Sequence, residues 1–143
     1  MFQDILRNTS TKTIIHRDLA GHTDGREIMK VFLICPVRNA SDEQKTEMVS
    51  YISDLEKVGS KVYYPARDTD QSDPTGYQIC SDNFKGIENA DEVHIFYDPK
   101  SAGSLFDLGM AFALGKPLKI VNQVEPTEGK SFSNMILEWK GRK

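Results

Sequence analysis

Four short apolar runs, separated by segments with helical periodicity, constrain the fold of this 143-residue chain more than any other feature. The first run, KVFLICP at 30–36, is apolar without alternation and ends at a proline, as is typical of a strand buried on both faces of a sheet. The predicted strands are 30–36, 60–65, 91–99 and 116–122. Apolar residues at helical spacing predict helices at 41–59, 77–90, within 101–117 and at 132–140.

This alternation predicts an α/β fold. Strands that alternate with helices through short links form parallel βαβ units. Right-handed crossovers then favour a doubly wound sheet, flavodoxin-like or Rossmann-like, of four to five strands with helices on both faces. The length suits one domain, which we place at residues 29–143, after a weakly patterned N-terminal extension at 1–28.

Composition argues against several classes of function. The net charge of −3 provides no basic surface for a nucleic-acid polymer and no polybasic signal for a membrane. No run of about 18 apolar residues is present, so no membrane-spanning helix is expected. Cys35 and Cys80 form neither a CxxC motif nor a disulfide framework, and residues 1–18 lack the apolar core of a signal peptide, which together predict a cytoplasmic protein. The histidines have no metal-ligand spacing, so we expect no metal and no cofactor.

Four polar segments follow the four predicted strands: PVRNAS, PARDTD, DPKSAGS and NQVEPTEG. In a doubly wound sheet, ligands bind outside the carboxyl ends of the strands, where the winding reverses. These segments therefore meet at the edge where a ligand is expected. No GxxxxGK[ST] or GxGxxG motif occurs among them, so neither a P-loop nor a dinucleotide fingerprint is present.

A carboxylate, Asp107, stands out in the nearly apolar helix that begins in the third segment. At helical spacing it shares a face with Gly103, Ala111 and Leu114. One interpretation is an acid near the helix start that interacts favourably with the helix dipole, worth about 0.3–1 kcal/mol. The other is a functional acid, because a carboxylate among small apolar groups loses hydration unless something uses it.

Other polar residues at this edge also allow two interpretations each. In SAGS, the hydroxyls of Ser101 and Ser104, the small Gly103 and the free N–H groups of a helix start form either an anion site or an ordinary serine cap. Arg38, directly after the first strand, is either a phosphate ligand or a surface residue. Asn83 lies on an apolar stripe, where its amide binds either a ligand or a loop backbone.

Together, the segments ICPVRNAS, GIENAD and SAGSLFDLGMAFALGKP resemble the nucleoside 2-deoxyribosyltransferase superfamily over about residues 30–137. They look closest to its branch of 2'-deoxynucleoside 5'-phosphate N-hydrolases. The third segment is the most specific, because it is similar to the Ser-x-Gly-…-Glu-Leu-Gly-x-Ala signature of that family.

The resemblance implies a role for each matching position. Asp107 falls where the family has its nucleophilic glutamate, and Asn83 falls where it usually has a second catalytic aspartate. Ser101 matches a phosphate-binding serine of the branch that uses phosphorylated substrates, where transferases of free nucleosides have an aspartate. Gly103 matches the glycine that lets backbone N–H groups approach the phosphate, and Arg38 matches the arginine of the first loop.

The resemblance also implies partners. Ser133 resembles a serine that reaches the phosphate of a neighbouring subunit, so a homodimer with sites near the subunit interface is expected. The base is usually held by the loop after the second strand, where Arg67, Asp68 and Asp70 are candidates.

The implied activity is hydrolysis of the N-glycosidic bond of a (deoxy)nucleoside 5'-monophosphate, a small-molecule substrate, through a covalent glycosyl-enzyme on Asp107. Two alternatives stay open. A non-catalytic nucleotide-binding or sensor protein is favoured by the changes at both carboxylate positions, Asp107 and Asn83. A deoxyribosyltransferase that acts between bases is the other, although Ser101 in place of an acid argues against free nucleosides.

Overall fold

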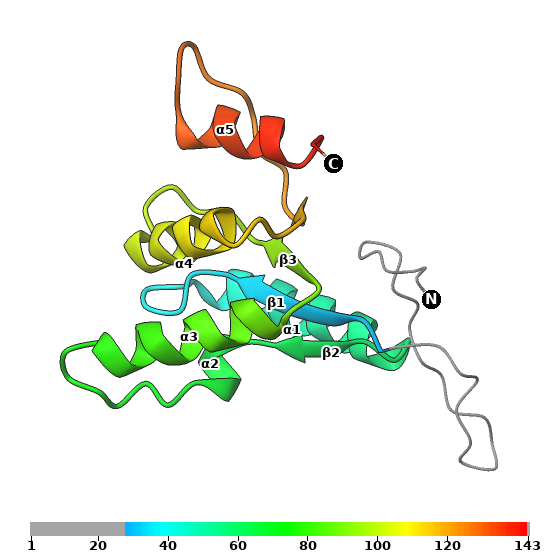
Figure 1. Ribbon diagram of the computed structural model, residues 1–143, viewed down its shortest axis with the longest axis vertical. Helices are drawn as coiled ribbons and strands as arrows, with labels where there is room; N and C mark the ends of the chain where they lie inside the picture. Colours follow the sequence, from blue (N-terminus) through cyan, green and yellow to red (C-terminus); the bar gives the residue numbers. More distant parts are fainter. Residues whose placement is uncertain (1–27, 143) are drawn as a thin grey trace.

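Four parallel strands form the sheet in the computed structural model, which describes residues 28–142 (Figure 1). They are β1 (Lys30–Ile34), β2 (Lys61–Tyr63), β3 (Glu92–Ile95) and β4 (Leu118–Ile120), in the order β2-β1-β3-β4. All three neighbouring pairs are parallel. The predicted α/β fold with a doubly wound sheet is therefore confirmed. The predicted N-terminal extension, except for its last residue, lies outside the described residues.

The helices begin and end close to the predicted positions, with one addition. They are α1 (Asp42–Lys57), α2 (Pro65–Asp68), α3 (Tyr77–Asn89), α4 (Ala102–Ala113) and α5 (Phe132–Trp139). At the start of α1, the Ser41 side chain accepts from the Gln44 N–H, and the Gln44 side chain accepts from the Ser41 N–H. α2 lies in a segment that the sequence predicts as a polar loop. Pro65 occupies its first position, where a proline fits a helix without losing a hydrogen bond.

Helices cover both faces of the sheet. α1 covers one face, where its buried residues pack against alternate strand residues: Met48, Ile52, Val31, Leu33 and Val62. α3, α4 and α5 cover the other face, where the core contains Ile87, Leu108, Ile136, Phe32, Ile34, Val93 and Ile95. Strand residues that are neighbours in sequence thus belong to different layers, as the alternation of side chains along a strand requires. No helix within residues 28–142 is long and apolar enough to cross a membrane.

The winding of the sheet reverses at β1, which lies between β2 and β3. The register pairs Ile34 with Ile95, so β1 and β3 end side by side. The segment after β1, at 35–41, and the segment between β3 and α4, at 96–101, therefore start from neighbouring points on one edge. This is the position at which doubly wound sheets bind their ligands.

Candidate functional site

Asp107 is a buried carboxylate at this edge of the sheet. Its residue is 7% exposed, and it belongs to the inner side of α4 together with Ser104, Leu108 and Ala111. Burial raises the pKa of Asp107 to about 7, while a hydrogen bond from Asn83 acts in the opposite direction. The side chain does not point into solvent, as a simple dipole-stabilising acid would. Near neutral pH it exists in both protonation states.

Asn83 is the polar partner that the structure brings to Asp107. It lies on α3, is 6% exposed, and directs its Nδ2 toward the two carboxylate oxygens of Asp107, at 3.3 and 3.5 Å. Its Oδ1 accepts a hydrogen bond of 2.8 Å from the hydroxyl of Thr69. Within the part of the chain that the structure describes, the Asn83 side chain thus bonds two other side chains and no loop backbone. An amide in this position can orient a carboxylate but cannot transfer a proton to it.

The charge of Asp107 acts on two thiols, Cys35 and Cys80. Burial, and then the charge of Asp107, raise the pKa of Cys35 to about 12. The same two causes raise the pKa of Cys80 on α3. Within residues 28–142, no lysine or arginine forms an ion pair with Asp107. Among these residues the ionised carboxylate is therefore stabilised by one amide, and none of their cations forms an ion pair with it.

The SAGS motif forms the start of α4, six residues before Asp107. The Ser101 hydroxyl caps the helix: its oxygen accepts from the Ser104 N–H at 3.2 Å, and its O–H donates to the Ser104 hydroxyl at 2.8 Å. Ser104 is 2% exposed, whereas Gly103 is exposed, and a Cβ added at Gly103 would meet no atom within 4 Å. Packing within the protein therefore does not require glycine at 103. The N–H groups of Ala102 and Gly103, in the first turn, have no acceptor within the helix.

Arg38 and Ser133 are less closely connected to Asp107. Arg38 is exposed in the turn after β1, beside Asn39, which has a φ of 65°. Ser133 is half-buried in the first turn of α5. Over the described range, neither side chain forms a hydrogen bond with Asp107, Asn83 or Ser101. The structure thus joins Asp107 to Asn83 and Ser101 to Ser104, and leaves the Arg38 guanidinium without a protein partner in that range.

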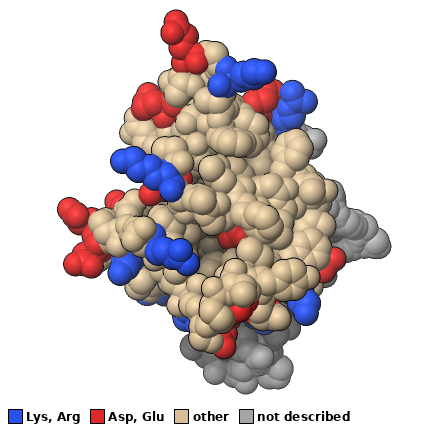
Figure 2. Space-filling view, turned by 90° about the vertical axis from the view of Figure 1, so that its left-hand side faces the viewer, with Lys and Arg blue, Asp and Glu red and all other residues tan. Residues whose placement is uncertain are grey.

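Figure 2 looks onto the side of the molecule toward which β1 and β2 point in Figure 1. The surface is hollowed near its centre, acidic atoms are visible inside the hollow, and both basic and acidic side chains lie to its left.

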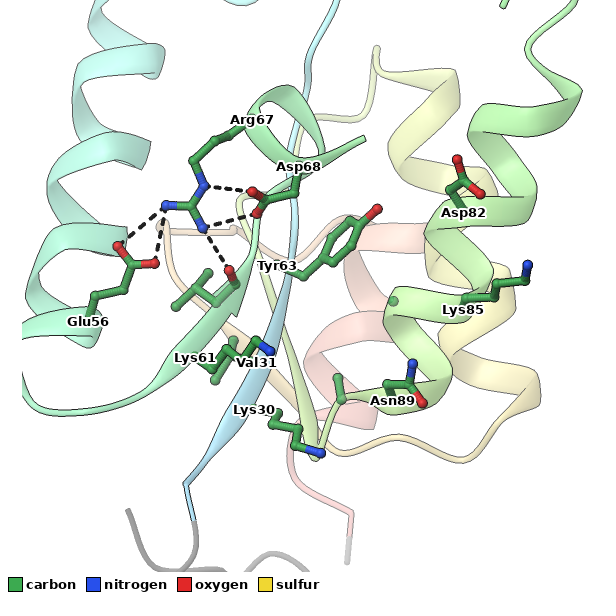
Figure 3. A pocket seen from close by; sticks show the side chains of 13 residues that line it. Lys30, Val31, Glu56, Lys61, Tyr63, Arg67, Asp68, Asp82, Lys85 and Asn89 are labelled. Carbon is green, nitrogen blue, oxygen red and sulfur yellow. Dashed lines mark hydrogen bonds and ion pairs between the residues drawn. The ribbon is translucent and has the colours of Figure 1, made fainter. Parts of the chain in front are cut away.

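A separate groove of about 850 Å³ lies along the edge strand β2, between α1 and α3 (Figure 3). Arg67 lies there but is fully engaged: it contacts Glu56 at 3.1 Å, Asp68 at 2.9 Å and the Val62 carbonyl at 2.8 Å. Asp68 also accepts from the Tyr64 N–H. These contacts hold α2 against β2, so Arg67 and Asp68, two candidates for binding the base, have structural roles.

Three residues near Asp107 were not expected from the sequence. Cys35 directly follows the buried first strand, and that position is the only signal that could have placed it at the edge. Thr69 and Cys80 carry no motif or spacing that connects them to residue 107. Their proximity depends on how α2 and α3 return to the sheet.

Comparisons with known proteins agree with this fold. The family model of nucleoside 2-deoxyribosyltransferase matches residues 31–140. Among solved structures, the 2-deoxyribosyltransferase of the psychrotolerant bacterium Bacillus psychrosaccharolyticus matches with a TM-score of 0.53 and 19% identity, over 64% of this chain and 70% of that chain. At this identity the likeness shows the fold alone. No curated protein matches the sequence. Since the family model covers most of the chain, the predicted superfamily is confirmed, and this protein belongs to the nucleoside 2-deoxyribosyltransferase family.

Proposed function

We propose that this protein hydrolyses the N-glycosidic bond of a (deoxy)nucleoside 5'-monophosphate, as the N-hydrolase branch of its family does, and releases a free base and a sugar 5-phosphate. The observation that carries the proposal is the burial of Asp107 at the ligand-binding edge without an ion-pair partner among the described residues. Burying such a carboxylate opposes folding. Groups of this kind are concentrated at functional sites.

In the proposed reaction Asp107 is the nucleophile. One carboxylate oxygen forms a bond to C1' while the C1'–N bond breaks, and the electron pair of that bond stays on the base nitrogen, which takes a proton from water. The transition state resembles an oxocarbenium ion, as in retaining glycosidases. A water molecule then attacks C1' and loses a proton to the hydroxide left by the first step, the bond between C1' and Asp107 breaks, and the carboxylate is restored. Asn83 orients the carboxylate through Nδ2 and transfers no proton.

The phosphate of the substrate is assigned to the start of α4. Gly103 offers its N–H group and open space above the helix, and Ser101 lies at the cap with Ser104 behind it. Arg38 supplies a guanidinium group that forms no ion pair with any described residue. Binding energy from the phosphate would position C1' over Asp107, so that contacts remote from the reacting bond increase the rate.

We also propose that two copies of the chain form a homodimer. A groove of about 570 Å³ between α3 and α4, beside the site, is lined by exposed aromatic side chains, including Tyr77, Phe84 and Phe106. A second copy of this chain would cover these rings. The family resemblance assigns Ser133 of each copy to the phosphate site of the other. Sedimentation at micromolar concentration should give the mass of a dimer, and Phe106→Glu should give a monomer. A monomeric wild type would contradict the proposal.

The test of the activity is a panel of ribo- and deoxyribonucleoside monophosphates, each incubated with wild type, Asp107→Ala and the control Asp54→Ala, with free base measured by chromatography. Asp54 is an exposed acid on α1. We expect base release by wild type and the control, and none above background by Asp107→Ala. Equal release by wild type and Asp107→Ala would contradict the proposed nucleophile.

Two further arms of the same panel test the alternatives. A second base added as acceptor identifies a transferase, if a new nucleoside or nucleotide forms faster than sugar phosphate. A nucleotide that binds and is recovered intact after days identifies a non-catalytic binding protein. Free nucleosides without phosphate should react much more slowly than monophosphates, since they lack the group that Arg38 and the α4 start would bind.

A further inference from the structure

A chain of four side chains leads from the edge strand to Asp107. The Tyr63 hydroxyl lies 2.6 Å from the Thr69 hydroxyl, which lies 2.8 Å from Asn83 Oδ1, and Asn83 Nδ2 lies 3.3 Å from a carboxylate oxygen of Asp107. The members come from β2, from the residue after α2, from α3 and from α4. Thr69 and Asn83 are 5% and 6% exposed, so bulk water does not compete for these bonds.

The direction of the hydrogen bonds in this chain is set at Tyr63. A phenol O–H is a stronger donor and a weaker acceptor than an aliphatic hydroxyl, so the Tyr63 hydroxyl donates to Thr69. The single hydroxyl proton of Thr69 is then directed to Asn83, where it meets the carbonyl oxygen, which can only accept. With Oδ1 occupied, the Asn83 amide directs its N–H groups toward Asp107.

Thr69 is held in place by α2. Its N–H donates to the Pro65 carbonyl at 3.1 Å and closes that single helical turn. Asp68 stabilises this helical turn, because its carboxylate accepts a hydrogen bond from the Tyr64 N–H at 2.8 Å. The Thr69 hydroxyl therefore reaches Asn83 from a rigid position and not from a free loop.

An amide has two orientations of nearly equal shape, and they present opposite groups to a carboxylate. With Nδ2 toward Asp107, the ionised acid is stabilised; with Oδ1 toward it, only the protonated acid can form a hydrogen bond. We propose that Thr69 is a positioning residue that fixes the Asn83 amide so that its N–H group faces Asp107. Its consequence for catalysis rests on the proposed function, in which the ionised form of Asp107 attacks the sugar.

No other group within the described residues donates a hydrogen bond to the Asp107 carboxylate. Among the described residues, the titratable groups on which the charge of Asp107 acts are Cys35, directly after β1, and Cys80, on α3. Burial raises the pKa of both thiols, so both stay neutral near pH 7. Burial raises the pKa of Asp107, and the hydrogen bond from the Asn83 amide is what opposes that rise, so the orientation of this amide affects how readily Asp107 ionises.

The test is a titration of the Asp107 carboxyl carbon by NMR in protein labelled with ¹³C-aspartate, its signal assigned by its loss in Asp107→Asn. Thr69→Val has nearly the shape of threonine but no hydroxyl, and should raise the titration midpoint of Asp107 by on the order of one pH unit. Thr69→Ser should restore the midpoint of wild type. Thr75→Val, which removes a hydroxyl from an exposed loop, is the matched control and should leave it unchanged. Should Thr69→Val not fold, Thr69→Ala removes the same hydroxyl and is titrated instead.

The titration does not depend on turnover, which separates this inference from the proposed function. A raised midpoint that serine reverses supports the role of Thr69 even if no substrate is cleaved, and the proposed function would then fail alone. An unchanged midpoint in the hydroxyl-free variant would overturn the inference, even in an active enzyme. In an active enzyme, the pH profile of kcat should move upward together with the midpoint.

Discussion

Replacing Asp107 by asparagine should stabilise the protein at neutral pH while it removes the proposed nucleophile. The pKa of Asp107 is raised from 3.8 to about 7, chiefly by burial. The difference is roughly three pH units, and at 1.36 kcal/mol per unit it corresponds to about 4 kcal/mol that opposes folding when the acid is ionised. Asparagine has nearly the same shape, carries no charge, and can still accept a hydrogen bond from Asn83.

The gain in stability should depend on pH in a defined direction. Because the folded state holds the proton of Asp107 more tightly than the unfolded state, its contribution to stability is fully present below pH 3.8 and is lost as the pH rises to about 7. The stability advantage of Asp107→Asn over wild type should therefore be small at pH 4 and reach up to about 4 kcal/mol at pH 8. Partial relaxation around the charge would reduce that figure.

Urea unfolding of wild type and Asp107→Asn at pH 4, 6 and 8 measures this difference. Asp54→Asn on α1 is the control, because it replaces an exposed acid and should change stability little. An advantage that is equal at pH 4 and pH 8 would refute the reasoning. A variant less stable than wild type at pH 8 would refute it as well, since it would mean that the ionised acid stabilises the fold.

Three further predictions concern other parts of the molecule. Arg38→Ala should raise KM for monophosphates on the order of 10-fold to 100-fold and leave the melting temperature unchanged, as measured by kinetics and calorimetry. Gly86→Ala should lower the free energy of unfolding in urea by about 1–3 kcal/mol, because a Cβ there would lie 3.0 Å from the Phe32 ring. Gly109→Ala, in open space on α4, should raise it by about 0.5–1 kcal/mol. Glu92→Gln should reduce stability more at pH 7 than at pH 4. The hydrogen bond to His94 lowers the pKa of Glu92, so the ionised Glu92 stabilises the fold, and this stabilisation is lost as the pH falls through that pKa.

Each of these predictions has an outcome that contradicts it. If Arg38→Ala raises KM equally for nucleosides without phosphate, Arg38 does not bind the phosphate. If the two glycine variants have the same stability, the close packing of α3 on β1 is not what requires Gly86. If the effect of Glu92→Gln is the same at both pH values, the charge of Glu92 does not contribute through His94.

The parts of the fold that could be predicted are those with a local pattern. The unbroken apolar run of β1 and the helical stripes of α1 and α4 depend on residues a few positions apart, so their order and the doubly wound sheet follow from the sequence. α2 could not be predicted in this way, because one turn is too short to show a period. It is held by contacts of Arg67 with Glu56 and Val62 and of Asp68 with the Tyr64 N–H, and none of these contacts leaves a periodic pattern in the sequence.

The candidate site also contains residues that a local sequence pattern predicts and residues that no such pattern indicates. The position of Asp107 on an apolar stripe predicts a buried acid, and the structure places it there. Its pairing with Asn83 links two helices, and the signals that pointed to Asn83 were its placement on a similar stripe and the family resemblance. Thr69 could not be predicted, since nothing in the spacing between residues 69 and 83 indicates that the chain returns to bring the two side chains together.

The most direct test of Asp107 as the nucleophile is mass spectrometry of protein quenched with acid within milliseconds of mixing with a reactive monophosphate. The account predicts that the peptide containing Asp107 gains the mass of the sugar 5-phosphate residue, and that Asp107→Ala shows no such gain on any peptide. Base release by wild type with the adduct on another residue, or undiminished turnover by Asp107→Ala, would contradict it.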